Sequence, residues 1–316
     1  MIWMPRSVYP FDQHDPYRHI GDFFLTVQQH PNLYSAIEIH REHIQSLQLN
    51  YGFFTPCSID YNYIFSQNAY MLLYYPLYIE TIAHVLSRIH PELLQSLFSD
   101  DVDVCIYGGG AIPEFFGFLY FIDEIYRDNH SLQFHIFDLY NWITWRDYLV
   151  RHMTPDYWSH EIPAVIPYHI DFCSLTSNSA YDPVPIIRTA KIHIFQNCLT
   201  EFIQRTGTIA NFKVLFQTFL DQIPVGSIVI FINIVNFDHS NPASGMDVQA
   251  RLQDIEAIMR DNNIGETLHP ISFYDPYFYN PNICRNNIPC IEINPRSESK
   301  YHTLVIRKTA TIGRTS

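Results

Sequence analysis

Residues 102–117 read Val-Asp-Val-Cys-Ile-Tyr-Gly-Gly-Gly-Ala-Ile-Pro-Glu-Phe-Phe-Gly, and this stretch decides the fold. A short apolar run leads into three glycines, and Pro113 follows at the start of a helix-like segment. Glycine adopts positive φ angles and lets a ligand approach the main chain, and proline is favourable in the first turn of a helix. We therefore predict a strand, a tight turn and a helix N-terminus. The free amide groups of such a turn, with the positive end of the helix dipole, favour a nucleotide or nucleoside ligand.

Downstream of this stretch, apolar strands alternate with amphipathic helices. Strands are predicted over 102–107, 132–137, 164–170, 192–195, 226–235, 271–274 and 303–307. Helices are predicted over 113–127, 142–150, 199–205, 211–222 and 248–261. Continuous apolar strands separated by helices are typical of a parallel sheet covered on both faces. The sequence therefore predicts an α/β fold with a doubly wound, mostly parallel, seven-stranded Rossmann-like sheet.

Upstream of residue 100 the apolar spacing is helical. We expect an extended arm over 1–16 and helices over 17–49, 66–87 and 92–98, with a turn at 50–56 and a kink at Pro76. The predicted organisation is an N-terminal arm and helical cap, 1–99, followed by a Rossmann-like cofactor-binding domain, 100–316.

Composition and charge limit the partners of the chain. The 316 residues are 47% apolar and 16% aromatic, which is typical of a folded protein with a large core. The net charge is −13 and there are only four lysines, so no basic field attracts a phosphate backbone. Nucleic acid is therefore a less favoured partner than a small molecule, and the many Phe and Tyr residues suit an apolar or aromatic ligand.

The six cysteines are scattered and form no Cys-x-x-Cys pair. Cys284 and Cys290 share one Pro- and Asn-rich loop and could form a disulfide or half of a metal site, but their spacing matches no standard site, so we expect no metal. The N-terminus lacks a signal-peptide core, and no apolar run approaches the roughly 18 residues that span a bilayer. We therefore expect a reduced, cytoplasmic protein that does not enter membranes.

Polar residues follow successive strands of the predicted sheet. The glycines follow the first strand, and the other strand ends carry Asp138, Asp171, Gln196-Asn197 and Asn233. Ligands of doubly wound sheets bind beyond the carboxyl ends of the strands, where the strand order switches. Because these residues all fall at or near such ends, the sequence predicts one binding site at this edge.

The glycine turn fits a dinucleotide site only in part. That site reads Gly-x-Gly-x-x-Gly with an acid roughly twenty residues further on. Here Gly108 and Gly110 are followed by Pro113 at the third position, and Asp138 lies 28 residues after Gly110.

The wider order of motifs resembles the class I S-adenosylmethionine-dependent methyltransferases: a glycine turn, an acid after strand two, Asp-Phe after strand three and Gln-Asn after strand four. The resemblance covers about residues 100–308, and the helical region before it is similar to the cap that such enzymes often place over the cofactor.

This resemblance implies roles for the residues after the first two strands. Gly108, Gly109 and Gly110 would pass under the methionine part and the ribose of S-adenosylmethionine. Asp138 would accept hydrogen bonds from the two ribose hydroxyls, with Leu139 beside it in the cofactor site. A plainer interpretation is that Asp138 caps the helix that follows.

The resemblance also implies roles for the residues at the ends of strands three and four. Asp171 would accept a hydrogen bond from the adenine amino group, with the backbone of Phe172 alongside and its ring available for stacking. Gln196 and Asn197 would line the cavity beside the sulfonium. Alternatively, Asp171 is a cap or turn residue, and the two amides satisfy backbone groups of a loop.

The chain departs from the family pattern at two positions. Ile106 stands where an acid often precedes the glycines, and Ile112 stands where a last glycine is common. Glu114, at the helix start where the dipole favours an acid, could reach the amino group of the cofactor instead. The same departures keep open a non-catalytic relative that retains the fold.

Methyl transfer depends mainly on holding the reacting groups in register, and a general base is needed only if the acceptor must lose a proton. Glu201, Asp238 and His239 are the candidate bases, since they follow strands four and five. We expect a methyltransferase acting on a small molecule, with RNA or protein as the alternative acceptor. Three tyrosines in the helical region are expected to pack in the core rather than contact the cofactor: Tyr70, Tyr74 and Tyr75.

Overall fold

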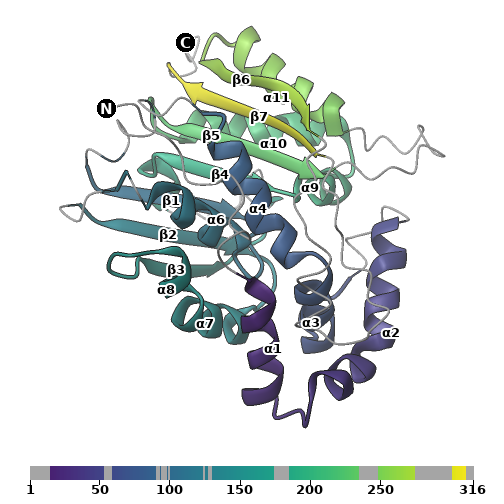
Figure 1. Cartoon of the computed structure of the whole chain (residues 1–316). Coiled ribbons are helices and arrows are strands. Elements are labelled where there is room, and N and C mark those ends of the chain that lie inside the picture. The colour runs from purple at the N-terminus through teal and green to yellow at the C-terminus, as the bar shows by residue number, and fades with distance from the viewer. Residues whose placement is uncertain are drawn as a thin grey trace.

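Seven strands form a single sheet in the computed structural model, which describes residues 15–52, 59–89, 93, 98, 100–123, 125–126, 130–173, 185–234, 248–274 and 301–310 (Figure 1). The strands are β1 (Val102–Tyr107), β2 (Leu132–Asp138), β3 (Ala164–His169), β4 (Ile192–Gln196), β5 (Ile228–Ile234), β6 (Gly265–Tyr274) and β7 (Tyr301–Lys308). Their order is β3-β2-β1-β4-β5-β7-β6. The first five are parallel, and β7 is antiparallel to both β5 and β6. This confirms the predicted doubly wound, mostly parallel Rossmann-like sheet, whose order switches between β1 and β4.

The central strands are buried on both faces because nearly every residue in them is apolar. All seven residues of β5 are buried, whereas the edge strand β3 is largely accessible. Along β4, Ile192 and Ile194 join one hydrophobic cluster, and Phe195 joins the cluster on the opposite face. The sheet thus separates two cores.

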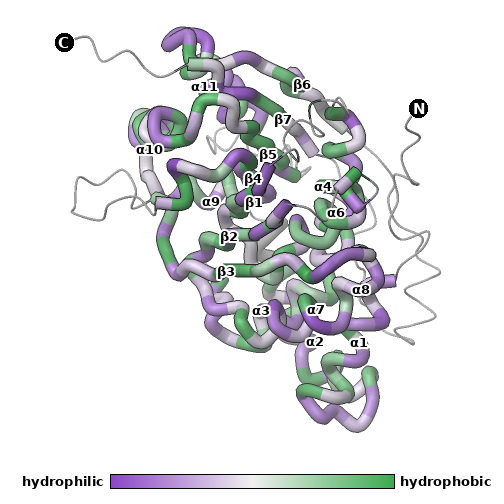
Figure 2. Tube along the Cα trace, turned by 90° about the vertical axis from the view of Figure 1, so that its left-hand side faces the viewer, coloured by the Kyte–Doolittle hydropathy of each residue, from purple (hydrophilic) through white to green (hydrophobic). Residues whose placement is uncertain are grey.

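Helices cover both faces of the sheet (Figure 1). One face carries α4 (Tyr75–Leu86), α6 (Pro113–Ile122), α7 (Ile143–His152) and α8 (Thr154–Tyr157), and the other carries α9 (Leu199–Thr206), α10 (Ile209–Gln222) and α11 (Val248–Asp261). Hydrophobic and hydrophilic residues alternate along the outer helices α10 and α11, as expected for helices with one buried face (Figure 2).

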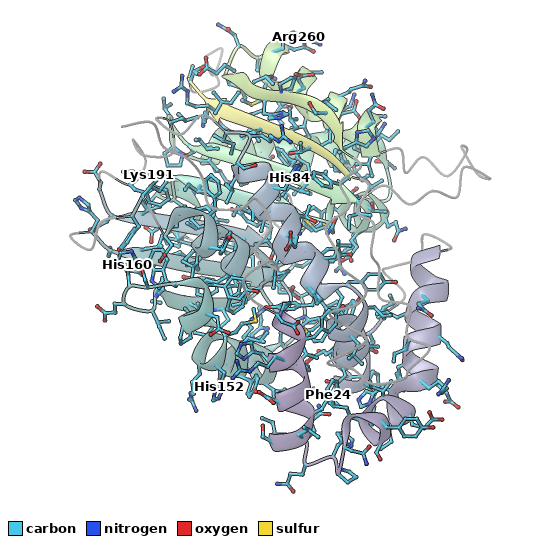
Figure 3. All side chains as sticks on the ribbon, viewed as in Figure 1. Phe24, His84, His152, His160, Lys191 and Arg260 are labelled. Atoms are coloured by element: carbon cyan, nitrogen blue, oxygen red, sulfur yellow. The ribbon has the colours of Figure 1, made fainter. Side chains whose placement is uncertain are left out.

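Helix α4 is buried along its whole length. It crosses α6 so closely that a Cβ atom on Gly117 would lie 2.3 Å from the carbonyl oxygen of Ile79. Its His84 lies beside the sheet, where the ring Nδ1 and the Tyr301 hydroxyl of β7 are hydrogen-bonded (Figure 3). The N-terminal region is therefore packed into the same core as the sheet.

Three further helices precede α4: α1 (Pro16–Thr26), α2 (Leu33–Gly52) and α3 (Ile64–Leu73). The side chain of Asp15 caps α1 by accepting a hydrogen bond from the Tyr17 amide at 2.9 Å. Phe23 of α1 stacks on Trp145 of α7 with ring centroids 3.7 Å apart. Helix α3 lies by the carboxyl ends of the parallel strands, with α2 packed against it (Figure 1).

Three predicted helices differ from the observed ones. The segment 17–49 divides into α1 and α2, and α2 continues to Gly52, through the start of the turn predicted at 50–56. The segment 66–87 breaks at Tyr74 rather than kinking, because Pro76 occupies the first turn of α4. The helix predicted over 113–127 ends at Ile122.

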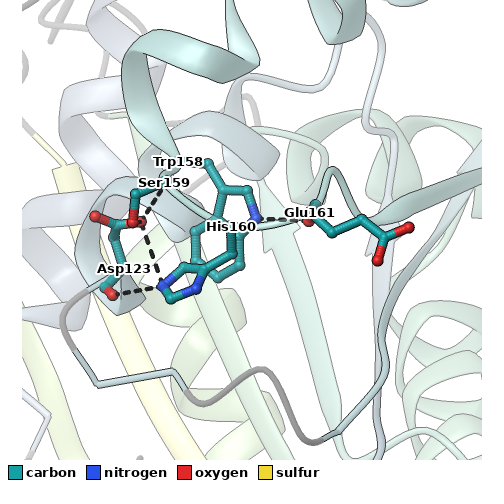
Figure 4. A network of polar contacts seen from close by, with 5 residues as sticks. All are labelled: Asp123, Trp158, Ser159, His160 and Glu161. Atoms are coloured by element: carbon teal, nitrogen blue, oxygen red, sulfur yellow. Dashed lines mark hydrogen bonds and ion pairs between the residues drawn. The ribbon is translucent and has the colours of Figure 1, made fainter.

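Asp123 anchors the end of α6 (Figure 4). Its carboxylate accepts hydrogen bonds from the Ser159 amide at 2.7 Å and the Ser159 hydroxyl at 2.9 Å. A ring nitrogen of His160 lies 3.1 Å from the Asp123 carbonyl oxygen, and the Trp158 indole donates to the Glu161 carbonyl at 2.8 Å. These contacts tie α6 to the segment that leads into β3.

Strand β6 begins at Gly265, six residues before the predicted start. Its pairing with β7 shifts register twice, between Thr267 and His269 and again before Ser272, which interrupts the alternation that identifies a strand. The predicted arm, apart from its last two residues, and nearly all of the helix predicted over 92–98 lie outside the described residues, as do Cys284 and Cys290. No described helix is both long and apolar enough to cross a membrane.

Candidate functional site

A pocket enclosing about 740 Å³ of empty space, part of it open to solvent, lies at the carboxyl ends of β1 to β4. Nine of the residues named from the sequence line it: Gly108, Gly110, Asp138, Leu139, Asp171, Phe172, Gln196, Asn197 and Glu201. Gly109 and Glu114 are not among the lining residues, and Asp238 and His239 lie outside the described part of the chain.

The glycine turn forms the floor of this pocket. Gly108 and Gly110 have φ angles of +67° and +47°, which residues with a side chain rarely adopt. A Cβ atom on Gly108 would lie 2.9 Å from that of Cys198, and one on Gly109 would lie 2.9 Å from methyl groups of two strand residues beneath it. Packing against neighbouring protein atoms therefore leaves no room for a side chain at Gly108 or Gly109.

Ile112 ends the turn in a left-handed conformation, with φ +59°, and caps α6. A β-branched residue rarely adopts this conformation, so the backbone here is strained. Its side chain is fully buried, and this packing holds the strained position in place. At this position the family pattern commonly has glycine, which would relieve the strain.

Asp138 is buried beside the turn, and both of its oxygens are bonded to backbone amides. One accepts from the Gly110 amide and the other from the Tyr140 amide, each at 2.7 Å. Trp142, and not Asp138, is the N-cap residue of α7. A carboxylate offers about four acceptor positions, so two remain for a ligand in the pocket. Burial raises the pKa of Asp138, while the amides and Arg146 favour the charged form.

Arg146 holds the same turn from behind. Its Nε donates to the Gly110 carbonyl at 2.7 Å, and the side chain is buried. The Gly110 peptide is thus fixed on one side by Arg146 and on the other by Asp138. Sequence reasoning missed this residue. The available signal was its helical spacing from the buried Trp142 and Leu149, which puts Arg146 on the inner face of α7.

Glu114 lies behind the turn and not in the pocket. It is 2% exposed, and its Oε2 has no hydrogen-bond partner among the described residues. The pKa of Glu114 is raised from 4.5 to about 8, mainly because of burial; a hydrogen bond from its own backbone amide and the charge of Arg146 oppose the rise, and Asp138 adds to it. Glu114 is therefore placed to carry a proton at neutral pH rather than to reach a ligand in the pocket.

A glutamine at position 114 should remove a pH dependence of stability. In the wild type the folded state keeps a proton that the unfolded state releases, because the pKa of Glu114 is about 8 when folded and 4.5 ordinarily. The free energy of unfolding then falls as pH rises between these two values. We expect Glu114→Gln to gain stability relative to the wild type over this interval, by up to a few kcal/mol, and the gain to level off above it.

Urea unfolding of both proteins at a series of pH values measures this difference. Glu201, whose pKa is also raised, contributes equally to both proteins and cancels. A difference that stays constant with pH would contradict the protonated, buried state assigned to Glu114.

The end of β3 supplies Asp171 and Phe172. One Asp171 oxygen accepts from the Cys173 amide at 3.0 Å, as in a turn, and the other accepts from Arg205 at 2.5 Å. The Phe172 ring is 4.9 Å from that of Phe202, within the core under α9 and α10. Both residues line the pocket. Asp171 also has the turn role that was its alternative interpretation, because it accepts from the Cys173 amide.

The end of β4 supplies two amide side chains. Gln196 is buried, and its Nε2 donates to the Tyr78 carbonyl at 2.9 Å. Asn197 has φ +59°, and its Oδ1 accepts from the Ile234 amide at 2.8 Å. The other half of each amide, Gln196 Oε1 and Asn197 Nδ2, is buried without a hydrogen-bond partner among the described residues.

Glu201 lies in the first turn of α9 and lines the pocket. Its pKa is raised to about 7, mainly because of burial; Asp138 contributes to the rise and Arg205 opposes it. Glu201 therefore interacts electrostatically with Asp138 and Arg205, which also line the pocket.

Five aromatic residues form the remaining side of the pocket, which we call the aromatic wall: Tyr61, Tyr70, Tyr78, Tyr140 and Trp142. Neighbouring rings have centroids 5.3 to 5.9 Å apart. Tyr70 therefore borders the pocket, contrary to the expected core role, whereas Tyr74 and Tyr75 do not line it. No spacing in the sequence distinguishes these residues from the other tyrosines.

This chain shows a weak resemblance to several solved structures. No protein-family model matches the sequence, and no curated protein matches it. Among solved structures, a SAM-dependent methyltransferase from Methanosarcina mazei is 8% identical, with 71% of this chain and 99% of that chain covered and a TM-score of 0.42. An rRNA methylase from Streptococcus thermophilus is 12% identical, with 69% and 93% covered and a TM-score of 0.37. An O-methyltransferase family protein from Burkholderia thailandensis is 12% identical, with 86% and 71% covered and a TM-score of 0.38.

All three structures are methyltransferases. All three TM-scores are below 0.5, so this likeness carries no argument about the chain, and any function has to follow from the pocket. The pocket is lined by three carboxylates, Asp138, Asp171 and Glu201, by the aromatic wall, and by the amides of Gln196 and Asn197. The described residues contain no group of three His, Cys, Asp or Glu side chains that could hold a metal ion.

Proposed function

We propose that the pocket binds S-adenosylmethionine and that the protein is a methyltransferase acting on a small molecule. The observation that carries this proposal is Asp138, a buried carboxylate that lines the pocket and keeps acceptor positions after bonding two backbone amides. Charge-assisted hydrogen bonds from paired ribose hydroxyls to a carboxylate would use those positions.

The other pocket residues suit the same ligand. Gly108 and Gly110 line the pocket with main-chain atoms alone. Asp171 lines the same pocket, and in the proposed complex its carboxylate accepts from the adenine amino group. The aromatic wall presents ring faces, which attract a cation such as a sulfonium.

When bound, the cofactor supplies a methyl group activated by its positively charged sulfur. The protein would contribute mainly by holding that group and the acceptor in register. We assign the helices of residues 1–99 the part of a cap, because Tyr61, Tyr70 and Tyr78 close one side of the pocket. If the acceptor is a hydroxyl, Glu201 is the described pocket residue whose pKa, about 7, suits a general base.

The acidic chain favours a small molecule over RNA, and a labelling experiment separates the alternatives. The protein is incubated with methyl-labelled S-adenosylmethionine and, separately, with small-molecule, RNA and protein fractions of a cell extract. We expect label in the small-molecule fraction, and much less of it, at a donor concentration near the wild-type Kd, when Asp138→Asn replaces the wild type. Label confined to RNA or protein would overturn the proposal that the acceptor is a small molecule. Donor binding without transfer of label to any fraction would indicate a non-catalytic relative.

A further inference from the structure

The amide of Gln196 is bonded at one end only. Its Nε2 donates to the Tyr78 carbonyl of α4, whereas its Oε1 is buried and has no partner among the described residues. The side chain is 3% exposed and lines the pocket. A buried acceptor without a donor is costly, and in native proteins such groups often belong to binding sites.

The orientation of this amide is fixed. If the group were turned over, its oxygen would face the Tyr78 carbonyl oxygen at 2.9 Å, and two acceptors would repel each other. The unpartnered atom of Gln196 is therefore an acceptor. The complementary group is an N–H or O–H donor.

The surroundings of Gln196 favour an aromatic ligand. Tyr78, whose carbonyl holds the amide, belongs to the aromatic wall, and its ring is 5.8 Å from that of Tyr70. Rings prefer to pack edge-to-face or offset on other rings. A planar ligand against this wall can direct a substituent toward the end of β4.

We infer that this side of the pocket is the acceptor subsite and that it takes an aromatic ring bearing an amino group, whose N–H donates to Gln196 Oε1. The inference rests on the proposed function for calling the ligand an acceptor, but the binding itself requires no methyl donor.

Nitrogen fits better than oxygen because of where the ionisable groups lie. A neutral amino nitrogen donates a hydrogen bond and still has a lone pair, whereas a hydroxyl has to lose its proton, which a carboxamide oxygen does not take up. In the proposed complex Asp138 and Asp171 accept hydrogen bonds from the cofactor, beside their bonds to the turn and to Arg205. Glu201 interacts with Asp138 and Arg205.

Binding of matched probes tests the subsite. Aniline, N,N-dimethylaniline and phenol are titrated into the wild type, without methyl donor, and followed by ligand-observed NMR. We expect aniline to bind at least about fivefold more tightly than its dimethyl derivative, which lacks the donor. Equal binding of these two overturns the inference, and so does phenol binding more than about tenfold more tightly than aniline, which would indicate a hydroxyl compound.

A pair of variants assigns the effect to Gln196. Gln196→Met keeps the length of the side chain and removes its oxygen, so the preference for aniline should vanish. Asn233→Leu is the matched control, because Asn233 is also a buried amide with an unpartnered oxygen at a strand end but does not line the pocket. A preference that survives in Gln196→Met contradicts the inference. Donor binding is titrated separately, so its absence would count against the proposed function alone.

Discussion

Replacing Asp138 by asparagine is expected to weaken the binding of S-adenosylmethionine by about 10- to 100-fold, the value of one or two charge-assisted hydrogen bonds. Asparagine keeps the size of the side chain but loses its charge. Its NH₂ group must also face a backbone amide of Gly110 or Tyr140, because both carboxylate oxygens accept from such amides. The variant therefore loses ligand contacts and a bond that shapes the turn. Isothermal titration calorimetry measures the affinity.

The control is Asp103→Asn. Asp103 lies on β1 outside the pocket, and its carboxylate contacts the ring of His135 at 3.0 Å. This variant loses a charge on the same sheet without touching the proposed ligand, so donor affinity should not change. If Asp138→Asn binds the donor as well as the wild type does, the assignment of Asp138 to the ribose fails.

Replacing Gly108 by alanine is expected to destabilise the fold by about 2–4 kcal/mol and to weaken donor binding at least about tenfold. A residue with a side chain is strained at φ +67°, and its Cβ would be 2.9 Å from that of Cys198. Relief of this contact requires the main chain to move in the pocket floor. Urea unfolding and calorimetry measure the two effects.

The variant Gly207→Ala separates the effect of backbone strain from the effect of the close Cβ contact at Gly108. Gly207 has φ +72°, but a Cβ atom there would meet nothing within 4 Å. We expect a loss of about 1–2 kcal/mol from the backbone strain alone, and no change in donor affinity. If Gly108→Ala and Gly207→Ala are equally stable and bind the donor equally well, the close packing of the turn has no role.

The sequence was most informative where local chemistry determines local structure. The apolar run, the glycines and Pro113 specify β1, the turn and the start of α6. Because the carboxyl ends of parallel strands share one edge, the polar residues after β2, β3 and β4 could be predicted to meet, and all of them line one pocket.

The sequence could not specify contacts between distant segments. Tyr70 and Tyr78 reach the pocket from α3 and α4, and Tyr61 reaches it from the turn before α3. No local pattern encodes that placement. The sequence also did not show that the Glu114 side chain lies outside the pocket. Ile112 takes a left-handed conformation at the start of α6, and the Glu114 side chain lies behind the turn, buried outside the pocket.

The identity of the cofactor is the central claim, and one titration tests it most directly. The wild-type protein is titrated by calorimetry with S-adenosylmethionine and, separately, with NAD. We predict saturable binding of S-adenosylmethionine at one site and no binding of NAD. Binding of NAD together with no heat from S-adenosylmethionine would contradict the account.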